Sequence, residues 1–185
     1  MKFLAKQDLA KVFRAAYEAR TEKSHLHHMA MLLQFFTGCR VSQLLNVRGE
    51  DVFMREGKFV ILIRAAKRGN EGTYSLHTDA DPAFNMAPLI EIAKTKGLSR
   101  IFGGLSRQYY NETLVRYFSA AGINSLYAHS HVFRHSAAMH VFDTTQRIGA
   151  VSSFLLHRSP SSAFVYLQEN DSSLAQQAMD ELQLA

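Results

Sequence analysis

Apolar side chains recur along most of the chain at the spacing of amphipathic helices. The first such series consists of Leu9, Val12, Phe13 and Tyr17. It predicts a helix over about residues 7–20. A second series follows Ser24, whose hydroxyl suits an N-terminal cap, and stops at Gly38, which suits a left-handed C-terminal turn. A short helix over about residues 41–47 is expected next.

The pattern changes in the middle of the chain, where extended segments replace helices. Residues 58–64 are apolar and β-branched, residues 73–77 form a second short run, and the Gly- and Asn-rich stretch 65–72 between them is typical of a hairpin turn. Two prolines introduce a helix that ends near Gly97. Further helices are predicted over about residues 106–121, 130–142, 145–156, a short stretch from 159, and 172–184. The predicted fold is therefore mainly α with a small antiparallel β-sheet (α+β).

Length and composition narrow the class of protein. The 185 residues fit one domain, and the apolar (47%) and charged (20%) fractions exclude a disordered chain. Cys39 is the only cysteine, which excludes a disulfide framework and a cysteine-based zinc site. The apolar runs are shorter than a bilayer span and no signal peptide is recognisable, so no membrane and a cytoplasmic location are expected. The net charge of +5 favours a polyanionic partner.

Several polar residues could carry chemistry, although each has an ordinary explanation when taken alone. Arg40 could offset the dipole at the end of a helix, and Lys67 could serve solubility at a hairpin tip. His131 and His135 are spaced like metal ligands on a helix, but no third ligand lies at a helpful spacing. Tyr166 lies in an apolar stretch and could be a core aromatic. Only their order and spacing together change this interpretation.

Taken in order, these residues resemble the tyrosine recombinase (phage integrase) family. The run Thr-Gly-Cys-Arg-Val-Ser over 37–42 resembles the family's first arginine motif, and residues 67–70 resemble its hairpin lysine motif. Residues 131–134, His-Val-Phe-Arg, match its histidine-x-x-arginine motif. Leu-Leu-His over 155–157 resembles its Leu-Gly-His, and Tyr166 follows nine residues later, as the nucleophile does in the family. The resemblance covers nearly the whole chain.

Two positions depart from the family pattern. Gln43 replaces a common glutamate, which removes an expected structural ion pair. Leu156 replaces the glycine before the histidine, which puts in question whether the turn there can present the imidazole of His157.

The resemblance implies a catalytic site composed of Arg40, Lys67, His131, Arg134, His157 and Tyr166. The phenol of Tyr166 would attack the scissile phosphate, and the two guanidinium groups would stabilise the charge of the transition state. Lys67 would protonate the leaving 5′-oxygen, His131 would accept or position a proton, and His157 would donate a hydrogen bond to the phosphate. Because one phosphodiester is exchanged for another, no cofactor and no metal are expected.

The resemblance also implies partners and an organisation. Double-stranded DNA is the expected partner, bound by a homotetramer on paired sites, with possible host architectural proteins. Residues 1–185 are expected to form a single catalytic domain, with the family's usual N-terminal core-binding domain absent. Residues 167–185 are expected to form a C-terminal helix whose apolar stripe either docks on a neighbouring protomer or folds back on its own domain.

Three functions remain open at this point. The leading one is a site-specific DNA recombinase that acts through a 3′-phosphotyrosyl intermediate, in integration, excision, inversion or resolution. Type IB topoisomerase-like nicking and relaxation would use similar chemistry. A DNA-binding regulator with a decayed catalytic site would instead explain Gln43 and Leu156 as signs of decay.

Overall fold

The computed structural model describes residues 3–19, 21, 23–65 and 70–158. Its helices are α1 (Lys6–Glu18), α2 (Ser24–Thr37), α3 (Val41–Leu44), α4 (Ala87–Lys96), α5 (Arg107–Ala120), α6 (His131–Thr145) and α7 (Ile148–Phe154). Its strands are β1 (Val52–Arg55), β2 (Lys58–Ile63) and β3 (Gly72–Ser75). Short 3-10 helices cover Gly49–Asp51, Pro82–Phe84 and Ser125–Tyr127. The predicted mainly helical α+β fold is confirmed.

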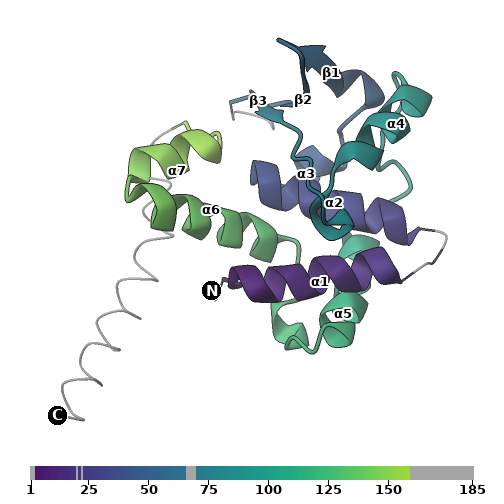
Figure 1. Cartoon of the computed structure of the whole chain (residues 1–185), viewed down its shortest axis with the longest axis vertical. Coiled ribbons are helices and arrows are strands. Elements are labelled where there is room, and N and C mark those ends of the chain that lie inside the picture. Colours follow the sequence, from purple (N-terminus) through teal and green to yellow (C-terminus); the bar gives the residue numbers. More distant parts are fainter. Residues whose placement is uncertain (1–2, 20, 22, 66–69, 159–185) are drawn as a thin grey trace.

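Helix α2 runs through the middle of the molecule, with α1 and α5 on one side and the sheet with α4 on another (Figure 1). All residues from 27 to 34 are buried, around the whole helix, as expected of a central helix. Ser24 is its first residue rather than its cap, because the Ser24 hydroxyl donates to the Thr21 carbonyl and accepts from the Thr21 N–H. Gly38 ends the helix at a φ of 61°, as predicted.

The sheet has the order β1-β2-β3 and is antiparallel throughout. Val52 pairs with Ile61, which pairs with Tyr74 on the other side. Strands β2 and β3 confirm the predicted extended runs, while β1 is an addition. Its hairpin turns through Glu56 and Gly57, both at positive φ.

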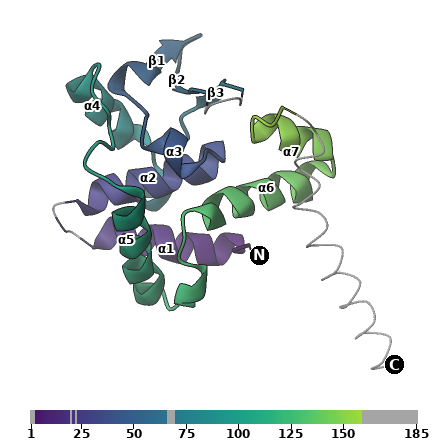
Figure 2. The same ribbon diagram turned by 180° about the vertical axis from the view of Figure 1, so that it is seen from behind.

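The main core joins the N-terminal and C-terminal halves of the chain. Phe13 of α1 stacks on Phe133 of α6 at 5.9 Å between ring centroids and contacts Phe84 edge-on at 5.7 Å. A smaller apolar cluster of Ala138, Val151 and Leu155 packs α7 on α6. Helix α6 therefore belongs to the main core at its start and carries α7 near its end. Helix α7 lies near the sheet, on the side of β3 (Figure 2).

The C-terminal helices differ from their predicted limits. Helix α6 continues to Thr145, since Gln146 only then takes a φ of 51° and ends it. Helix α7 is correspondingly shorter than the predicted segment 145–156. The helices predicted after residue 158 lie outside the described residues. No helix within the described ranges is long and apolar enough to cross a membrane.

Candidate active site

Arg134, on the first turn of α6, joins three parts of the fold in a buried position. Its side chain is 4% exposed and donates to the carbonyls of Gly38, through Nη1, and of Leu155, through Nη2 at 3.1 Å. These carbonyls follow the C-termini of α2 and α7, where helix dipoles concentrate negative potential. The guanidinium is therefore held in one place by the ends of two helices.

His157 lies against this guanidinium. Its Nε2 is 2.9 Å from Nη2 of Arg134. Because arginine only donates hydrogen bonds, Nε2 of His157 is the acceptor and the neutral ring carries its proton on Nδ1. Burial, followed by the charges of Arg134 and Arg40, lowers the pKa of His157 to about 4.

The turn that presents His157 forms despite the leucine before it. The N–H of Leu156 donates to the Ser153 carbonyl at 3.1 Å, and the N–H of His157 donates to the Ser152 carbonyl at 2.9 Å. This pair of bonds is a Schellman motif, whose left-handed position is usually glycine. Leu156 takes it with a φ of 56°. The departure from glycine therefore does not prevent the turn.

Arg40 directly precedes α3, where Gln43 connects it to the sheet. Gln43 Oε1 accepts from the Arg40 N–H at 3.0 Å, and Gln43 Nε2 donates to the Arg64 carbonyl at 3.0 Å. A carboxylate could make only the first of these bonds, since it has no hydrogen to donate. The amide therefore replaces the expected ion pair with a two-sided hydrogen-bonded link.

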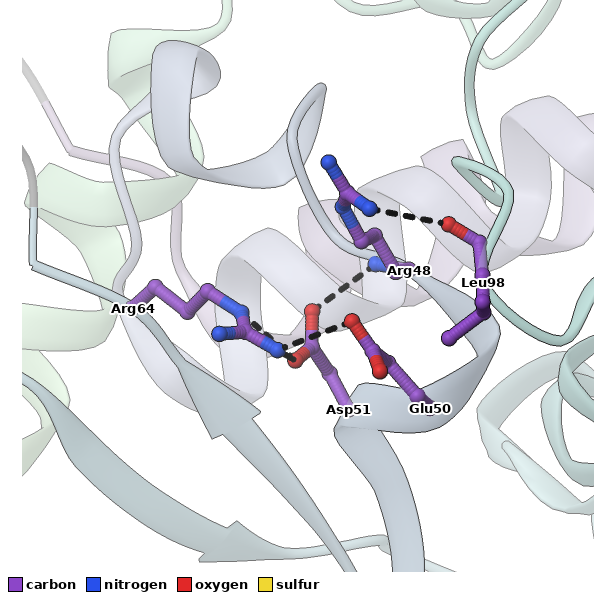
Figure 3. A network of polar contacts seen from close by, with 5 residues as sticks. All are labelled: Arg48, Glu50, Asp51, Arg64 and Leu98. Atoms are coloured by element: carbon purple, nitrogen blue, oxygen red, sulfur yellow. Dashed lines mark hydrogen bonds and ion pairs between the residues drawn. The ribbon is translucent and has the colours of Figure 1, made fainter.

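This link continues into a charged network at the end of β2 (Figure 3). The guanidinium of Arg64 lies 2.6 Å from Asp51 Oδ1 and 3.2 Å from Glu50 Oε1. Asp51 is 1% exposed, and its second oxygen accepts from the Arg48 N–H at 2.9 Å. The hydrogen bond and charge of Asp51 raise the pKa of Arg64. The network holds the segment whose carbonyl Gln43 binds.

His131, at the start of α6, belongs to the same electrostatic environment. Its side chain is exposed, but partial desolvation lowers its pKa, and the charges of Arg107, Arg134 and Arg40 lower it further. Arg40 and Arg134 thus act on both His131 and His157. Four of the six predicted site residues are therefore brought together.

The other two predicted site residues, Lys67 and Tyr166, lie outside the described residues. Two contacts that the sequence did not indicate join the start of β3 to the end of α7. Asn70 Nδ2 donates to the His157 carbonyl at 3.2 Å, and the Tyr74 hydroxyl donates to the Phe154 carbonyl at 2.5 Å. Asn70 is the last residue of the stretch 67–70 that resembles the hairpin lysine motif, and no sequence signal points to Tyr74.

The remaining candidates have structural explanations. His135 is buried, 6.2 Å from the Phe3 ring between centroids. Cys39 is buried in the main core, and burial raises its pKa to about 11, as expected of an inert thiol. His28 Nε2 donates to the Ala83 carbonyl at 2.8 Å. In the described ranges, no group of three or more histidine, cysteine, aspartate or glutamate side chains could hold a metal ion.

Comparison with known proteins gives consistent matches. The phage integrase family model matches residues 2–173. Tyrosine recombinase XerD of Xanthomonas axonopodis pv. citri is 29% identical over 157 residues, which cover 76% of this chain and 50% of XerD. The chain spans about half the length of the curated relatives it matches.

Two solved structures show the same fold. The post-cleavage complex of XerH site-specific recombinase with palindromic difH substrate has a TM-score of 0.75 and 19% identity over 96% of this chain and 52% of that one. A lambda integrase tetramer bound to a Holliday junction has a TM-score of 0.62 and 19% identity over 89% of this chain and 47% of that one. Since the family model covers most of the sequence and the fold agrees with it, the chain belongs to the phage integrase family.

Proposed function

We propose that this protein is a site-specific DNA recombinase that cuts and rejoins strands through a 3′-phosphotyrosyl intermediate. One observation carries the proposal. The buried guanidinium of Arg134 is hydrogen-bonded to two carbonyls and an imidazole, and within the described part of the chain it has no carboxylate ion pair. Arg40 adds a second positive charge that acts on the same histidines. A site with this excess of positive charge is suited to an anion such as a DNA phosphate.

The two arginines are assigned to the transition state. As a phosphorus atom gains a fifth oxygen, negative charge builds on its non-bridging oxygens. Fixed guanidinium donors stabilise that charge more than they stabilise the ground state. The three acceptors of Arg134 hold it in place before DNA arrives, so little reorganisation is needed.

The chemical step is an exchange of phosphodiesters. The Tyr166 oxygen forms a bond to phosphorus, the bond from phosphorus to the 5′-oxygen breaks, and Lys67 gives that oxygen a proton. His131 takes the phenol proton, a role for which its lowered pKa leaves it neutral at pH 7. A 5′-hydroxyl from another strand then reverses the step and releases Tyr166. The roles of Lys67 and Tyr166 rest on the family resemblance.

His157 is assigned to the phosphate. Its ring is neutral, and its Nε2 faces Arg134 in the structure. A neutral imidazole donates one hydrogen bond, and we assign that bond to a phosphate oxygen. This assignment needs no charge on His157.

The proposed partners follow from the family. We assign double-stranded DNA as the substrate and a homotetramer on paired sites as the active assembly, like the lambda integrase tetramer on a Holliday junction. Host architectural proteins are further proposed partners.

Covalent capture tests the proposal. A pool of duplexes with randomised arms, each nicked so that the cut fragment diffuses away, should yield a protein–DNA adduct with the wild type. Tyr166→Phe should abolish the adduct, and Arg134→Ala should reduce its rate about 10²–10³-fold, as loss of a preorganised donor does. Tyr17→Phe, at an exposed tyrosine, is the control and should leave the rate unchanged. A chelator should have no effect.

The same assay separates the competing functions. Adduct formation that survives Tyr166→Phe would show that the nucleophile is another residue. A wild type that binds DNA but never forms an adduct would favour the regulator. Relaxation of a supercoiled plasmid without paired sites would favour topoisomerase-like activity.

A further inference from the structure

Two residues near the site do not match their backbone conformations: a leucine occupies a position that favours glycine, and a glycine occupies a position that does not need one. Leu156 occupies a left-handed position, with a φ of 56°, that favours glycine. Gly72, at the start of β3, has no positive φ and needs no glycine for its backbone. Neither residue is explained by its own conformation.

Their mutual packing explains both. A Cβ atom on Gly72 would lie 2.6 Å from Cδ2 and 3.4 Å from Cδ1 of Leu156. The leucine side chain thus fills the space that any other residue at position 72 would need. Leu156 is partly buried there and packs against the main core.

A second contact lies on the same face of β3. Side chains alternate between the faces of a strand, so positions 72 and 74 share a face while Thr73 points away and is exposed. The Tyr74 hydroxyl donates to the Phe154 carbonyl, and the two rings meet edge-on at 5.9 Å. This face of β3 therefore meets the end of α7 and the turn that follows it, as the neighbouring positions of β3 and α7 in both views illustrate (Figures 1 and 2).

We propose that Leu156 is a positioning residue. Its side chain packs against the backbone of Gly72 and thereby docks the His157 turn on β3, which holds His157 against Arg134. The turn is also held by the Schellman bonds to α7, by the bond from Asn70 to the His157 carbonyl, and by the bonds from Arg134 to the Leu155 carbonyl and the His157 ring. Among these contacts, the Leu156 side chain is the one that packs the turn on the backbone of β3. The docking itself is independent of the proposed function. Its consequence for DNA cleavage rests on that function.

Two single substitutions remove the contact from opposite sides. Gly72→Val places a branched side chain where Leu156 lies and displaces it. Leu156→Gly leaves the turn conformation allowed but removes the side chain that docks it. The double variant combines room for valine with a glycine at the left-handed position, so it restores a packed pair. Thr73→Val, on the exposed face of β3, is the matched control.

The readout is the pKa of His157, followed by NMR in the whole protein without DNA and assigned by its loss in His157→Asn. We expect a value near 4 in the wild type and in Thr73→Val, because the turn stays beside Arg134 and Arg40. In each single variant the pKa should rise toward about 6.5, the value of a solvated histidine. In the double variant it should return toward the wild-type value. Thermal unfolding shows that each variant is folded.

Adduct formation at saturating DNA is the second readout. Each single variant should be slowed roughly 10–100-fold, as expected when a site group is misplaced by about 1 Å, with the double variant partly restored. An unchanged His157 pKa in Leu156→Gly overturns the proposal, and so does a double variant no better than Gly72→Val. If Gly72→Val does not fold, the His157 pKa in Leu156→Gly still tests the proposal. If the wild type forms no adduct, the proposed function fails while the titration still tests the docking.

Discussion

Gln43 shows how one amide connects a candidate catalytic arginine to the sheet. It accepts from the Arg40 N–H and donates to the Arg64 carbonyl. The family commonly has a glutamate at this position, so its replacement by Gln43 is expected to remove an ion pair. The structure shows that the amide makes a bond to the Arg64 carbonyl that an ionised carboxylate could not make, so the departure is compatible with an ordered site.

Gln43→Glu tests this link. At pH 7 the glutamate should lower the free energy of unfolding by about 1–3 kcal/mol, because a buried donor is lost and a carboxylate faces the Arg64 carbonyl. The facing carbonyl raises the pKa of the new carboxyl group, so the deficit should shrink as the pH falls and the group protonates and donates. Urea unfolding at pH 7 and pH 4 measures the difference in the free energy of unfolding between Gln43→Glu and the wild type. Gln7→Glu, at an exposed position, should show no such deficit.

His157 contributes a pH dependence whose sign follows from its environment. Its pKa is about 4 in the folded protein, below the ordinary value of about 6.5 in the unfolded chain. The unfolded state therefore binds more protons between these values, and the contribution of His157 is complete above about pH 6.5 and is lost as the pH falls toward 4.

Thermal unfolding at pH 7 and pH 4.5 measures this contribution. His157→Asn should lose less stability across the interval than the wild type, because it has no imidazole to protonate. Other histidines with lowered pKa values, including the buried His27 and the exposed His131, remain in both proteins, so their effect cancels in the comparison. An equal loss in both proteins would contradict the placement of His157 beside Arg134.

At the scale of elements, the end of α2 and the end of α7 pack closely together. Gly38 ends α2 in a left-handed conformation, and its carbonyl accepts from Arg134. A Cβ there would lie 2.7 Å from Leu155 Cδ2 and 2.8 Å from Phe154 Cε1. Glycine is therefore required at this position by both the turn and the close approach of α7.

Gly38→Ala should lower the free energy of unfolding by about 2–5 kcal/mol, the sum of left-handed strain and overpacking. Gly122→Ala is a matched control, because Gly122 has a φ of 69° but open space around its Cβ position. It should cost only the strain, about 1–2 kcal/mol. Denaturant unfolding of both variants separates the two effects, and equal losses would show that α7 does not approach Gly38 as closely as described.

Elements with strong local signals were predictable, and those defined by distant contacts were not. The apolar spacing of α1 and the glycine after α2 set these helices to within about two residues. Strand β1 escaped prediction, since three of its four residues are exposed and its turn through Glu56 and Gly57 lacks the usual Asn-Gly signal. The boundary between α6 and α7 depends on Gln146, which has no special signal for a left-handed turn.

At the scale of the molecule, the order of motifs along the chain predicted six site residues, of which the structure describes four. Arg40, the α6 pair His131 and Arg134, and His157 come from three segments far apart in sequence and share one electrostatic environment. What the sequence could not indicate is how they are held. The contacts of Asn70, Tyr74 and the Gly72–Leu156 pair depend on β3 lying beside the end of α7, which no local pattern specifies.

The salt dependence of DNA binding tests whether the positive charges of Arg40 and Arg134 bind a phosphate. Each phosphate neutralised by a cation releases counterions, which adds about 0.9 to the slope of log affinity against log salt concentration. If Arg40 and Arg134 bind one phosphate between them, the double variant with alanine at both positions should reduce the slope by about that amount and weaken binding to all duplex sequences alike. Fluorescence anisotropy with a labelled duplex between about 50 and 200 mM salt measures both quantities.

Arg14→Ala provides the control, since Arg14 on α1 is exposed and already paired with Asp81 at 2.6 Å. Its slope should match the wild type, because a cation neutralised within the protein releases few counterions from DNA. A double variant with an unchanged slope would mean that the phosphate lies elsewhere. The positive charge gathered around Arg134 would then serve only to tie α2, α6 and α7 together, and the covalent chemistry would need another pocket.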